Sequence, residues 1–342
     1  MDVRTALTAL IEKRDLSRDE MLSIMRQIMQ GELTPVQIAG FLVALRCKGE
    51  TITEIAAAAS VMRELSTKVP LALDEHLVDT CGTGGDGAHT FNISTASAIV
   101  AAAAGAKVAK HGGRSVSSTC GSADVLESLG VNVNLTPGQV AQSVEEIGVG
   151  FMFAPNHHSA MKFAAPVRRE LAVRTLFNLL GPMTNPAGAR NQVMGVFSRD
   201  LVGKLAHVLK ELGSRHVMVV HAADGLDEIS LDGDTYVAEL KDGQVTEYTL
   251  NPAQFAINSS ASSYLAVHTI DEAKVKLHSV FDLQPGPARD IVVLNAGAAI
   301  YVAGLASSLS EGVEKARHTI ANGAAKAKLE QLIKFTQQFA AH

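Results

Sequence analysis

The sequence contains no tryptophan, and aromatic residues make up only 4% of its 342 residues. Proteins that bind single-stranded nucleic acid stack bases on aromatic side chains, and proteins that bind duplexes carry an excess of basic residues to meet the phosphates. Here 35 acidic residues outnumber 30 basic ones, which gives a formal net charge of -5. The composition therefore argues against a nucleic-acid-binding protein.

Cysteine is also scarce, because only Cys47, Cys81 and Cys120 are present. The number is odd and no two of them have the C-x-x-C spacing, which argues against a disulfide framework and against a structural zinc site. We expect structural thiols in a reducing compartment.

Long apolar runs are missing as well. The longest run of small apolar residues, 96–104 with its flanks, is far shorter than the roughly 20 residues that cross a bilayer, and it predicts a buried helix. The first 15 residues alternate charged and apolar types, unlike the basic start and apolar block of a secretory signal. We expect no membrane segment and a cytoplasmic location.

The chain is long enough for two unequal domains. Residues 1–66 repeat apolar side chains at helical spacing with interruptions, which predicts a bundle of four short helices. Thr34 followed by Pro35 predicts an N-cap with proline in the first turn, and Thr51 with Glu54 three residues later predicts a capping box.

After Pro70 the pattern changes to short strand-like segments that alternate with glycine loops and helices. This alternation predicts an α/β fold with a mostly parallel sheet. Residues 233–250 predict a hairpin at the sheet edge that turns at Asp242-Gly243. The expected strands before the hairpin are 76–80, 107–111, 151–154 and 216–222, and the expected closing helices are 295–305 and 311–340.

The most informative stretch is 79–95, DTCGTGGDGAHTFNIST, which has four glycines within six positions directly before a predicted helix. Glycine lets the backbone turn sharply and approach a bound group, and the positive end of a helix attracts an anion. The stretch therefore favours a phosphate or pyrophosphate pocket, with a plain turn at a strand end as the alternative. Neither a G-x-G-x-x-G nor a G-K-[ST] pattern occurs here, so a dinucleotide site or a P-loop is not indicated.

Three carboxylates suggest that a cation binds together with the phosphate. Asp86 lies inside the glycine-rich stretch, where it would repel a phosphate unless a cation stood between them, or where it simply caps a turn. Asp227 and Glu228 follow another glycine, and with a hydroxyl such as Ser94 they would suit Mg²⁺, which binds few carboxylates together with substrate phosphates. A solvated turn is the alternative for this pair.

Basic residues gather in two further segments. Residues 110–124, KHGGRSVSSTCGSAD, combine cationic side chains with serines and glycines, which favours an anion site over a plain surface loop. In 151–186, Arg168 and Arg169 open a predicted helix, and either guanidinium fork matches an aromatic acid's carboxylate or simply faces solvent. The neighbouring histidines 157 and 158 lack the i, i+4 spacing of a helical zinc pair.

Together, GTGGD with FNIST, KHG.R..SS..GSAD.LE, APVRREL..RT.FN.LGP.TNP and the later DE pair closely resemble the anthranilate phosphoribosyltransferase family over nearly the whole chain. The resemblance implies a small helical domain, residues 1–70 with about 165–188, which forms a homodimer. It packs on an α/β domain of 71–164 and 189–342. The implied reaction is Mg²⁺-dependent transfer of the 5-phosphoribosyl group from phosphoribosyl pyrophosphate to the amine of anthranilate, in tryptophan biosynthesis.

The resemblance also implies roles for single residues. Lys110 and Arg168 would position the substrates, and no residue would act as acid or base. The implied metal ligands are Ser94, Asp227 and Glu228. Anthranilate would contact Gly82, His111, Gly113, Arg168 and Pro182. The donor would contact Gly82, Thr83, Gly84, Gly85, Asp86, Thr90, Asn92, Ser94, Thr95, Lys110 and Ser122.

Two departures from the family pattern concern the acceptor. Gly113 stands where the commonest wording, KHGNR, has an asparagine that contacts anthranilate. Ser159 stands where HHP has a proline, which we expect to loosen the loop that carries the two histidines. Two other functions stay open as alternatives: a pyrimidine nucleoside phosphorylase-like enzyme, and a non-catalytic relative that binds nucleic acid or a phosphorylated ligand.

Overall fold

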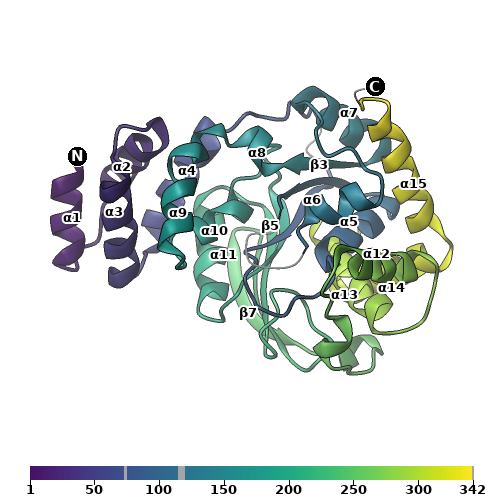
Figure 1. Cartoon of the computed structure of the whole chain (residues 1–342). Helices are drawn as coiled ribbons and strands as arrows, with labels where there is room; N and C mark the ends of the chain where they lie inside the picture. The colour runs from purple at the N-terminus through teal and green to yellow at the C-terminus, as the bar shows by residue number, and fades with distance from the viewer. Residues whose placement is uncertain (73–74, 115–119, 341–342) are drawn as a thin grey trace.

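The computed structural model describes residues 1–72, 75–114 and 120–340, and its N-terminal part is the predicted helical bundle (Figure 1). Thr34 and Thr51 cap their helices as predicted, the first with Pro35 in the opening turn and the second in a capping box with Glu54. The four helices are α1 (Val3–Ile11), α2 (Arg18–Gln30), α3 (Pro35–Lys48) and α4 (Ile52–Leu65).

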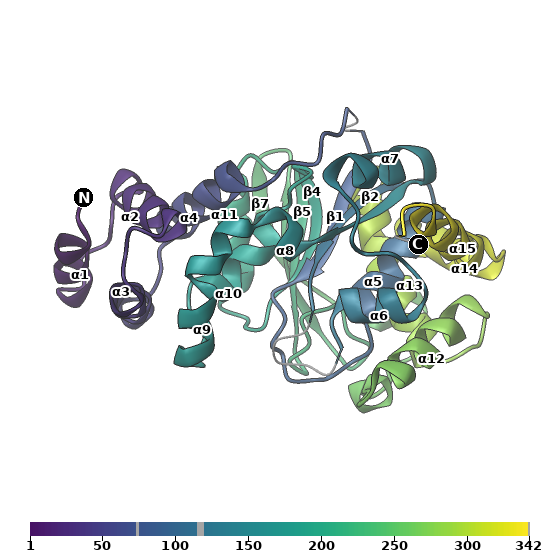
Figure 2. The same cartoon turned by 45° about the horizontal axis from the view of Figure 1, so that its top comes forward.

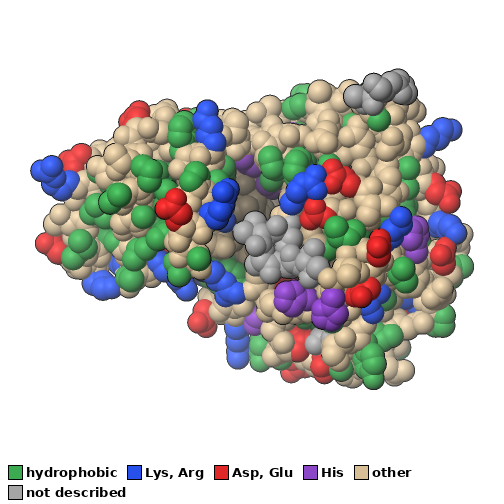
Figure 3. Space-filling view, viewed as in Figure 1, with side chains coloured by type: hydrophobic (Ala, Val, Ile, Leu, Met, Phe, Trp, Pro, Cys, Tyr) green, Lys and Arg blue, Asp and Glu red, His purple; other side chains and the backbone are tan. Residues whose placement is uncertain are grey.

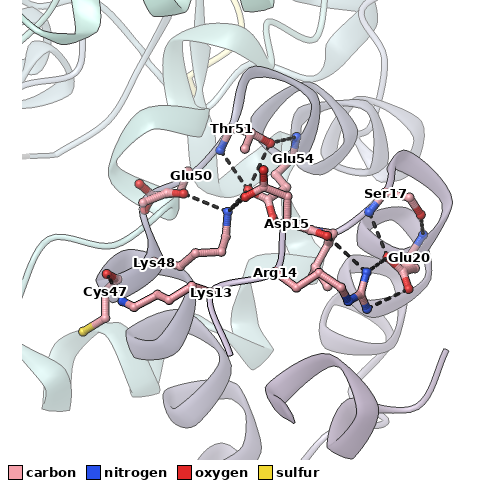
Figure 4. Close-up of polar contacts among 12 residues, drawn as sticks. Lys13, Arg14, Asp15, Ser17, Glu20, Cys47, Lys48, Glu50, Thr51 and Glu54 are labelled. Carbon is pink, nitrogen blue, oxygen red and sulfur yellow. Dashed lines mark hydrogen bonds and ion pairs between the residues drawn. The ribbon is translucent and has the colours of Figure 1, made fainter. Parts of the chain in front are cut away.

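A buried polar cluster joins the helices of this bundle (Figure 4). Glu54 has no exposed surface and accepts hydrogen bonds from the backbone N–H groups of Leu16 and Thr51, each at 2.8 Å. The Lys48 ammonium lies 2.8 Å from the same carboxylate and 2.6 Å from that of Asp15. The charge of Glu54 is therefore neutralised, and the link between α1 and α2 is held against the start of α4.

The rest of the chain is built on a seven-stranded sheet in the order β3-β2-β1-β4-β5-β6-β7. The first five of these strands are parallel, and β6 and β7 form the predicted antiparallel edge hairpin, which turns at Asp242-Gly243 with both φ angles positive. The strands are β1 (Leu77–Gly82), β2 (Lys107–Gly112), β3 (Val149–Phe153), β4 (Asn191–Gly195), β5 (His216–Ala222), β6 (Thr235–Lys241) and β7 (Gln244–Leu250).

Helices cover both faces of the sheet (Figures 1 and 2). Successive side chains of a strand point to opposite faces, so Val193 joins the core beneath α5 and α13, whereas Met194 joins the core beneath α11. The remaining α-helices are α5 (Ile93–Ala103), α6 (Ser122–Ser128), α7 (Pro137–Ile147), α8 (Ala154–His157), α9 (Ala165–Leu171), α10 (Phe177–Leu180), α11 (Leu201–Glu211), α12 (Ile270–Phe281), α13 (Pro287–Val302), α14 (Leu309–Ala321) and α15 (Ala324–Gln337).

Helices α9 and α10 lie against the N-terminal bundle, where α9 contacts α3 and α10 contacts α4. Val167 and Phe177 belong to the same hydrophobic core as the bundle, and that core continues to Leu205 on α11 and Val217 on the sheet. The predicted grouping of 165–188 with residues 1–70 therefore has packing in its favour, but the division into two domains stays a prediction.

The structure differs from the sequence-based expectations in several elements. Strand β4 and helix α12 were not expected, α13 begins at Pro287 rather than at 295, and 311–340 is divided because Gly323, with φ of 79°, separates α14 from α15. Within the described residues, no helix combines the length and apolar character that a membrane crossing requires.

Candidate active site

The predicted site segments follow β1, β2, β3 and β5, and the loop after β4 lies beside them, at the carboxyl ends of adjacent parallel strands. In open α/β sheets this edge is where ligands bind. Figure 3 shows the surface hollowed between the helical bundle and the α/β part, with Lys and Arg side chains on the bundle side of the hollow. The sheet thus gathers segments that are far apart in the sequence.

The glycine-rich loop that follows β1 is fixed at its start by the neighbouring strand end. The Thr83 N–H donates to the Gly195 carbonyl at 2.9 Å, and the Thr83 hydroxyl accepts from the Phe197 N–H at 3.1 Å. Gly84 and Gly85 then adopt left-handed φ angles of 66° and 77°, which glycine reaches without strain. The loop leads into the N-terminus of α5, as the sequence predicts.

Asp227 sits in a space that two glycines leave open. A Cβ on Gly82 would lie 2.3 Å from Asp227 Oδ2, and a Cβ on Gly195 would lie 1.5 Å from the Asp227 carbonyl oxygen. The same carboxylate accepts a hydrogen bond from the Gly84 N–H at 2.9 Å. The glycine-rich loop and the Asp-Glu pair, which are 143 residues apart in the sequence, therefore form one site.

The carboxylates of this site repel one another. Burial, followed by the negative charge of Asp86, raises the pKa of Asp227 to about 7. Burial and the charge of Asp227 raise the pKa of Glu228 well above its ordinary value, although Lys110 and the Ser94 N–H oppose that rise. Asp86 also accepts from the Ala88 N–H at 3.1 Å, so it does cap a turn, as the alternative interpretation held.

Lys110 is the buried cation of the site, with 4% of its surface exposed. Its ammonium donates to the Thr80 carbonyl and, at 3.2 Å, to the Ser94 hydroxyl in the first turn of α5. It also lowers the pKa of Glu228, which indicates that its charge faces the carboxylates. A fixed positive charge therefore lies at the start of α5 and acts on the pKa of Glu228.

The residues fit a magnesium ion that arrives with a phosphorylated ligand. Among the described residues no three His, Cys, Asp or Glu side chains converge closely enough to hold a metal alone. Mg²⁺ usually binds through one or two carboxylates and completes its shell with water and substrate phosphates. Asp227 and Glu228 supply hard oxygen ligands with excess negative charge, and the Ser94 hydroxyl lies next to Lys110, which faces them.

The loop that follows β2 joins the starts of two helices. Asn92 donates to the Cys120 carbonyl at 3.1 Å, and Ser122 donates to the Gly113 carbonyl at 3.3 Å. Residues 115–119, which carry most of the predicted serines, lie outside the described residues. Arg114, which the sequence placed in an anion site, forms ion pairs with Asp124 at 2.7 Å and with Glu127 at 2.6 Å.

Two of the residues implied to contact phosphoribosyl pyrophosphate, Thr90 and Thr95, have other surroundings. Thr90 forms an antiparallel bridge with Ala266, which joins the end of the glycine-rich stretch to a segment before α12. Thr95 is 1% exposed, and its hydroxyl has no hydrogen-bond partner among the described residues. Their roles toward the donor stay predictions.

One of the implied acceptor residues, His111, belongs to a pair of buried histidines. His111 and His158 have ring centroids 5.0 Å apart, and the buried His111 Nε2 atom has no hydrogen-bond partner among the described residues. Burial and neighbouring histidines lower the pKa of His111 to about 3 and that of His158 to about 4. Both rings are therefore neutral at pH 7.

Arg168 and the remaining histidine lie further along the same segment. The half-buried Arg168 guanidinium lies 5.6 Å from the centre of the Phe177 ring, and burial lowers its pKa. It forms no hydrogen bond or ion pair with another described residue, so the structure does not join it to His111 directly. His157 Nδ1 lies 2.9 Å from the Thr67 carbonyl, which makes it a structural residue.

Sequence reasoning missed a buried carboxylate beneath the site. Asp79 is 1% exposed, and it accepts from the His111 N–H at 3.2 Å and from the Asn185 amide at 2.7 Å. The same Asn185 amide donates to the Ala109 carbonyl at 2.9 Å. An aspartate inside the predicted strand HLVDT was the available indication, because a buried charge requires partners.

The class of protein follows from the site. A cluster of carboxylates with excess negative charge lies against a glycine-rich loop at the carboxyl edge of a parallel sheet. The protein is an α/β enzyme that binds a phosphorylated substrate together with a divalent cation. Comparison with known families agrees. The chain belongs to the glycosyl transferase family, because the model of that family's α/β domain matches residues 74–326 and the model of its helical bundle domain matches residues 4–66.

Individual relatives cover almost the whole chain. A curated anthranilate phosphoribosyltransferase from Thiobacillus denitrificans is 65% identical over 333 residues, which are 97% of each chain. The crystal structure of the anthranilate phosphoribosyltransferase from Thermus thermophilus has a TM-score of 0.92 at 43% identity and covers 97% of this chain and 99% of that chain. The enzyme from Saccharomyces cerevisiae in complex with PRPP and Mg has a TM-score of 0.87 at 27% identity, with 98% of each chain covered.

Proposed function

We propose that this protein is a Mg²⁺-dependent anthranilate phosphoribosyltransferase of tryptophan biosynthesis. It transfers the 5-phosphoribosyl group of phosphoribosyl pyrophosphate to the amine of anthranilate and releases pyrophosphate. The observation that carries the proposal is the junction of the glycine-rich loop with Asp227 and Glu228, because it places a phosphate-type loop against carboxylates whose pKa values are raised by burial and by neighbouring negative charge. The relatives at 57–65% identity support the choice of acceptor.

The chemistry requires little proton transfer from the protein. The amine nitrogen forms a bond to ribose C1 as the bond from C1 to the pyrophosphate oxygen breaks, with inversion, and the nitrogen then loses a proton to solvent. An aromatic amine is neutral at pH 7, so attack needs no strong base. The neutral state of His111 agrees with that requirement, because the ring does not present a positive charge to the nucleophile.

The protein residues then act by holding the partners in line and by stabilising the leaving group. The amides of the glycine-rich loop, the N-terminus of α5 and Lys110 would hold the pyrophosphate. Asp227, Glu228 and Ser94 would hold Mg²⁺, which neutralises negative charge on the departing pyrophosphate when it is bound. Arg168 would face the carboxylate of anthranilate, and Gly82, His111, Gly113 and Pro182 would line the pocket.

An assay with purified protein tests the proposal. Anthranilate fluorescence should fall when phosphoribosyl pyrophosphate and Mg²⁺ are both present, and it should stay constant without the donor or with EDTA. A parallel reaction with thymidine and inorganic phosphate tests the nucleoside phosphorylase alternative and should release no thymine. Constant anthranilate fluorescence in the complete mixture would overturn the choice of acceptor, and thymine release would favour the alternative.

We also propose a homodimer formed through the helical bundle. Helix α3 is apolar on its outer side as well as its inner side: Val36 is 81% exposed, Val43 is 39% exposed, and Gly40 and Cys47 lie exposed at the helical spacing between and after them. An exposed apolar stripe of this kind is typical of an association surface. A cytoplasmic location stays a prediction from the sequence.

Light scattering after size-exclusion chromatography tests the dimer. The double variant Val36→Asp with Val43→Asp should convert a species of twice the chain mass into one of single mass. Val275→Asp on α12 is the matched control, because Val275 is 67% exposed and lies outside the bundle. A wild-type protein of single chain mass would refute the proposal.

A further inference from the structure

Arg174 lies in the segment between α9 and α10 and reaches the glycine-rich loop from the bundle side of the molecule. Its guanidinium donates a hydrogen bond to the Gly85 carbonyl and stacks on the Phe197 ring, 4.1 Å from the ring centre. The arginine therefore joins three segments that are remote in sequence: the α9–α10 link, the glycine-rich loop and the end of β4.

We propose that Arg174 is a positioning residue that fixes the conformation of the glycine-rich loop, residues 83–87, for the phosphorylated donor. The proposal rests on the phosphoribosyl transfer proposed above and assigns Arg174 to donor binding. Arg174 acts through the backbone of Gly85, so it is not placed among the groups that touch the reacting atoms.

The geometry of the peptide unit explains how the contact would act. In a trans peptide the C=O and the following N–H point in opposite directions. A guanidinium that holds the Gly85 carbonyl on one side of the loop therefore directs the Asp86 N–H to the other side. Gly84 and Gly85 both have left-handed φ angles, so this peptide has few steric constraints of its own and depends on external contacts for its orientation.

The Phe197 stack holds the arginine in place. The Phe197 N–H donates to the Thr83 hydroxyl at 3.1 Å, so the ring that supports Arg174 is attached to the first residue of the same loop. Arg174 and Phe197 thus contact the loop at Gly85 and Thr83, two residues apart. Arg168, proposed for the acceptor, precedes Arg174 by six residues, so one short segment serves both substrates.

A simple surface arginine is the competing explanation, because Arg174 is exposed and exposed cation contacts contribute little to stability. The two explanations differ in what the variant Arg174→Ala changes. A surface residue would leave kinetics unchanged, whereas a positioning residue would alter the KM of the donor. Arg199 provides a matched control, because it is also exposed and stacks on Tyr236 at 3.8 Å, without a hydrogen bond to the loop.

The experiment compares wild type, Arg174→Ala, Arg174→Lys, Phe197→Leu and Arg199→Ala in steady-state assays with each substrate varied. For Arg174→Ala we expect the donor KM to rise roughly tenfold, the change that corresponds to the loss of one charge-assisted hydrogen bond of about 1.4 kcal/mol. The values of kcat and of the anthranilate KM should change less than about twofold, since Arg174 contributes no charge to the departing pyrophosphate. Arg174→Lys should recover part of the loss, Phe197→Leu should show a smaller loss, and Arg199→Ala should match wild type.

Hydrogen exchange gives a second measurement that does not depend on turnover. Backbone amides of residues 83–88 should exchange faster in Arg174→Ala than in wild type or Arg199→Ala, with an unchanged melting temperature. If wild type is active and Arg174→Ala keeps both its donor KM and its loop protection, the positioning role is wrong. A fall in kcat at constant donor KM would also overturn it, whereas an inactive wild type would instead overturn the proposed function.

Discussion

The carboxylate cluster of the helical bundle and the carboxylate cluster at the sheet edge differ in how their negative charge is compensated. In the helical bundle, Glu54 receives two backbone N–H groups and the Lys48 ammonium. At the sheet edge, Asp227 and Glu228 face Asp86 and each other, and the pKa values of both are raised. The first cluster is complete within the chain, whereas the second has negative charge in excess.

This difference separates residues that stabilise the fold from residues that serve a ligand. A buried charge without a partner is costly, so a protein retains it where something outside the chain completes it. Lys110 lowers the pKa of Glu228, but burial and then the charge of Asp227 outweigh that effect and leave the pKa raised. The cation and the phosphates that would complete this cluster belong to the substrate complex.

The largest effect is expected at the incomplete cluster. Asp227→Asn combined with Glu228→Gln removes the charges that attract Mg²⁺ while keeping the shape of the side chains. Turnover should fall by about a thousandfold or more, because the leaving pyrophosphate loses its counter-charge. Anthranilate binding, followed by fluorescence titration, should change little. Activity that persists at saturating Mg²⁺ would refute the metal assignment.

The complete cluster should respond in the opposite way. Glu54→Ala leaves the buried Lys48 ammonium with the exposed Asp15 as its one carboxylate partner beside the Gly49 carbonyl, and it leaves two backbone N–H groups unpaired. The free energy of unfolding should fall by about 3–5 kcal/mol, measured by urea denaturation, while kcat of the folded enzyme stays near that of wild type.

Glu64→Ala is the control for that variant, because Glu64 pairs with Arg26 on the surface, where both side chains are about half exposed. It should cost less than about 1 kcal/mol. Equal losses of unfolding free energy in the two variants would show that the buried contacts of Glu54 stabilise the fold no more than a surface ion pair does.

The pH dependence of stability should also separate the clusters. The pKa of Asp227 is raised from 3.8 to about 7 in the folded protein, so between these values the folded state binds more protons than the unfolded chain. Stability without metal should therefore fall as the pH rises through that window. Asp227→Asn abolishes this term, so its melting temperature in EDTA should exceed that of wild type by a margin that grows from pH 5 to pH 7.5.

The buried histidines act in the reverse direction, because their pKa values are lowered and stability is lost as the pH falls below the ordinary value of 6.5. The comparison of wild type with Asp227→Asn at each pH cancels that contribution. A difference in melting temperature that does not change with pH would mean that the pKa of Asp227 is not raised in the folded protein.

The smallest effect is expected at Gly113. Among the described residues, a Cβ at this position would have only the Ala154 Cβ within 4 Å, at 4.0 Å, so those residues leave room for an asparagine side chain. Gly113→Asn should restore the amide of the common family pattern and lower the anthranilate KM by about twofold to tenfold, the value of one neutral hydrogen bond. Gly113→Ala, which adds bulk without an amide, is the control and should not lower that KM.

Local sequence patterns predicted the helical bundle, most strands and the glycine-rich loop, because each depends on residues near one another in the chain. Strand β4 was missed because its Asn191 and Gln192 are polar, and only the structure shows their amides bonded to the Leu77 and Pro182 carbonyls. The break between α14 and α15 depends on one glycine in a left-handed conformation, a weak indication within a long helical pattern.

The site residues also divide into those that local sequence patterns identify and those that depend on contacts remote in the sequence. Gly84, Lys110 and the Asp-Glu pair were identified from their types and from the family resemblance, but nothing local indicates that Asp227 lies against Gly84. Arg174 and Asp79 escaped notice because their partners, Gly85 and Asn185, are 89 and 106 residues away. Contacts of that separation follow from the strand order, which sequence patterns leave open.

The most direct test of the contrast between the two clusters is titration calorimetry of phosphoribosyl pyrophosphate with four proteins: wild type, Asp227→Asn with Glu228→Gln, Glu54→Ala and Glu64→Ala. We predict donor binding that requires Mg²⁺ in wild type, Glu54→Ala and Glu64→Ala, and that no longer responds to Mg²⁺ in the Asp227 and Glu228 variant. Donor binding that responds to Mg²⁺ equally in all four proteins would contradict the account, because the unneutralised carboxylates would then have no part in holding the cation.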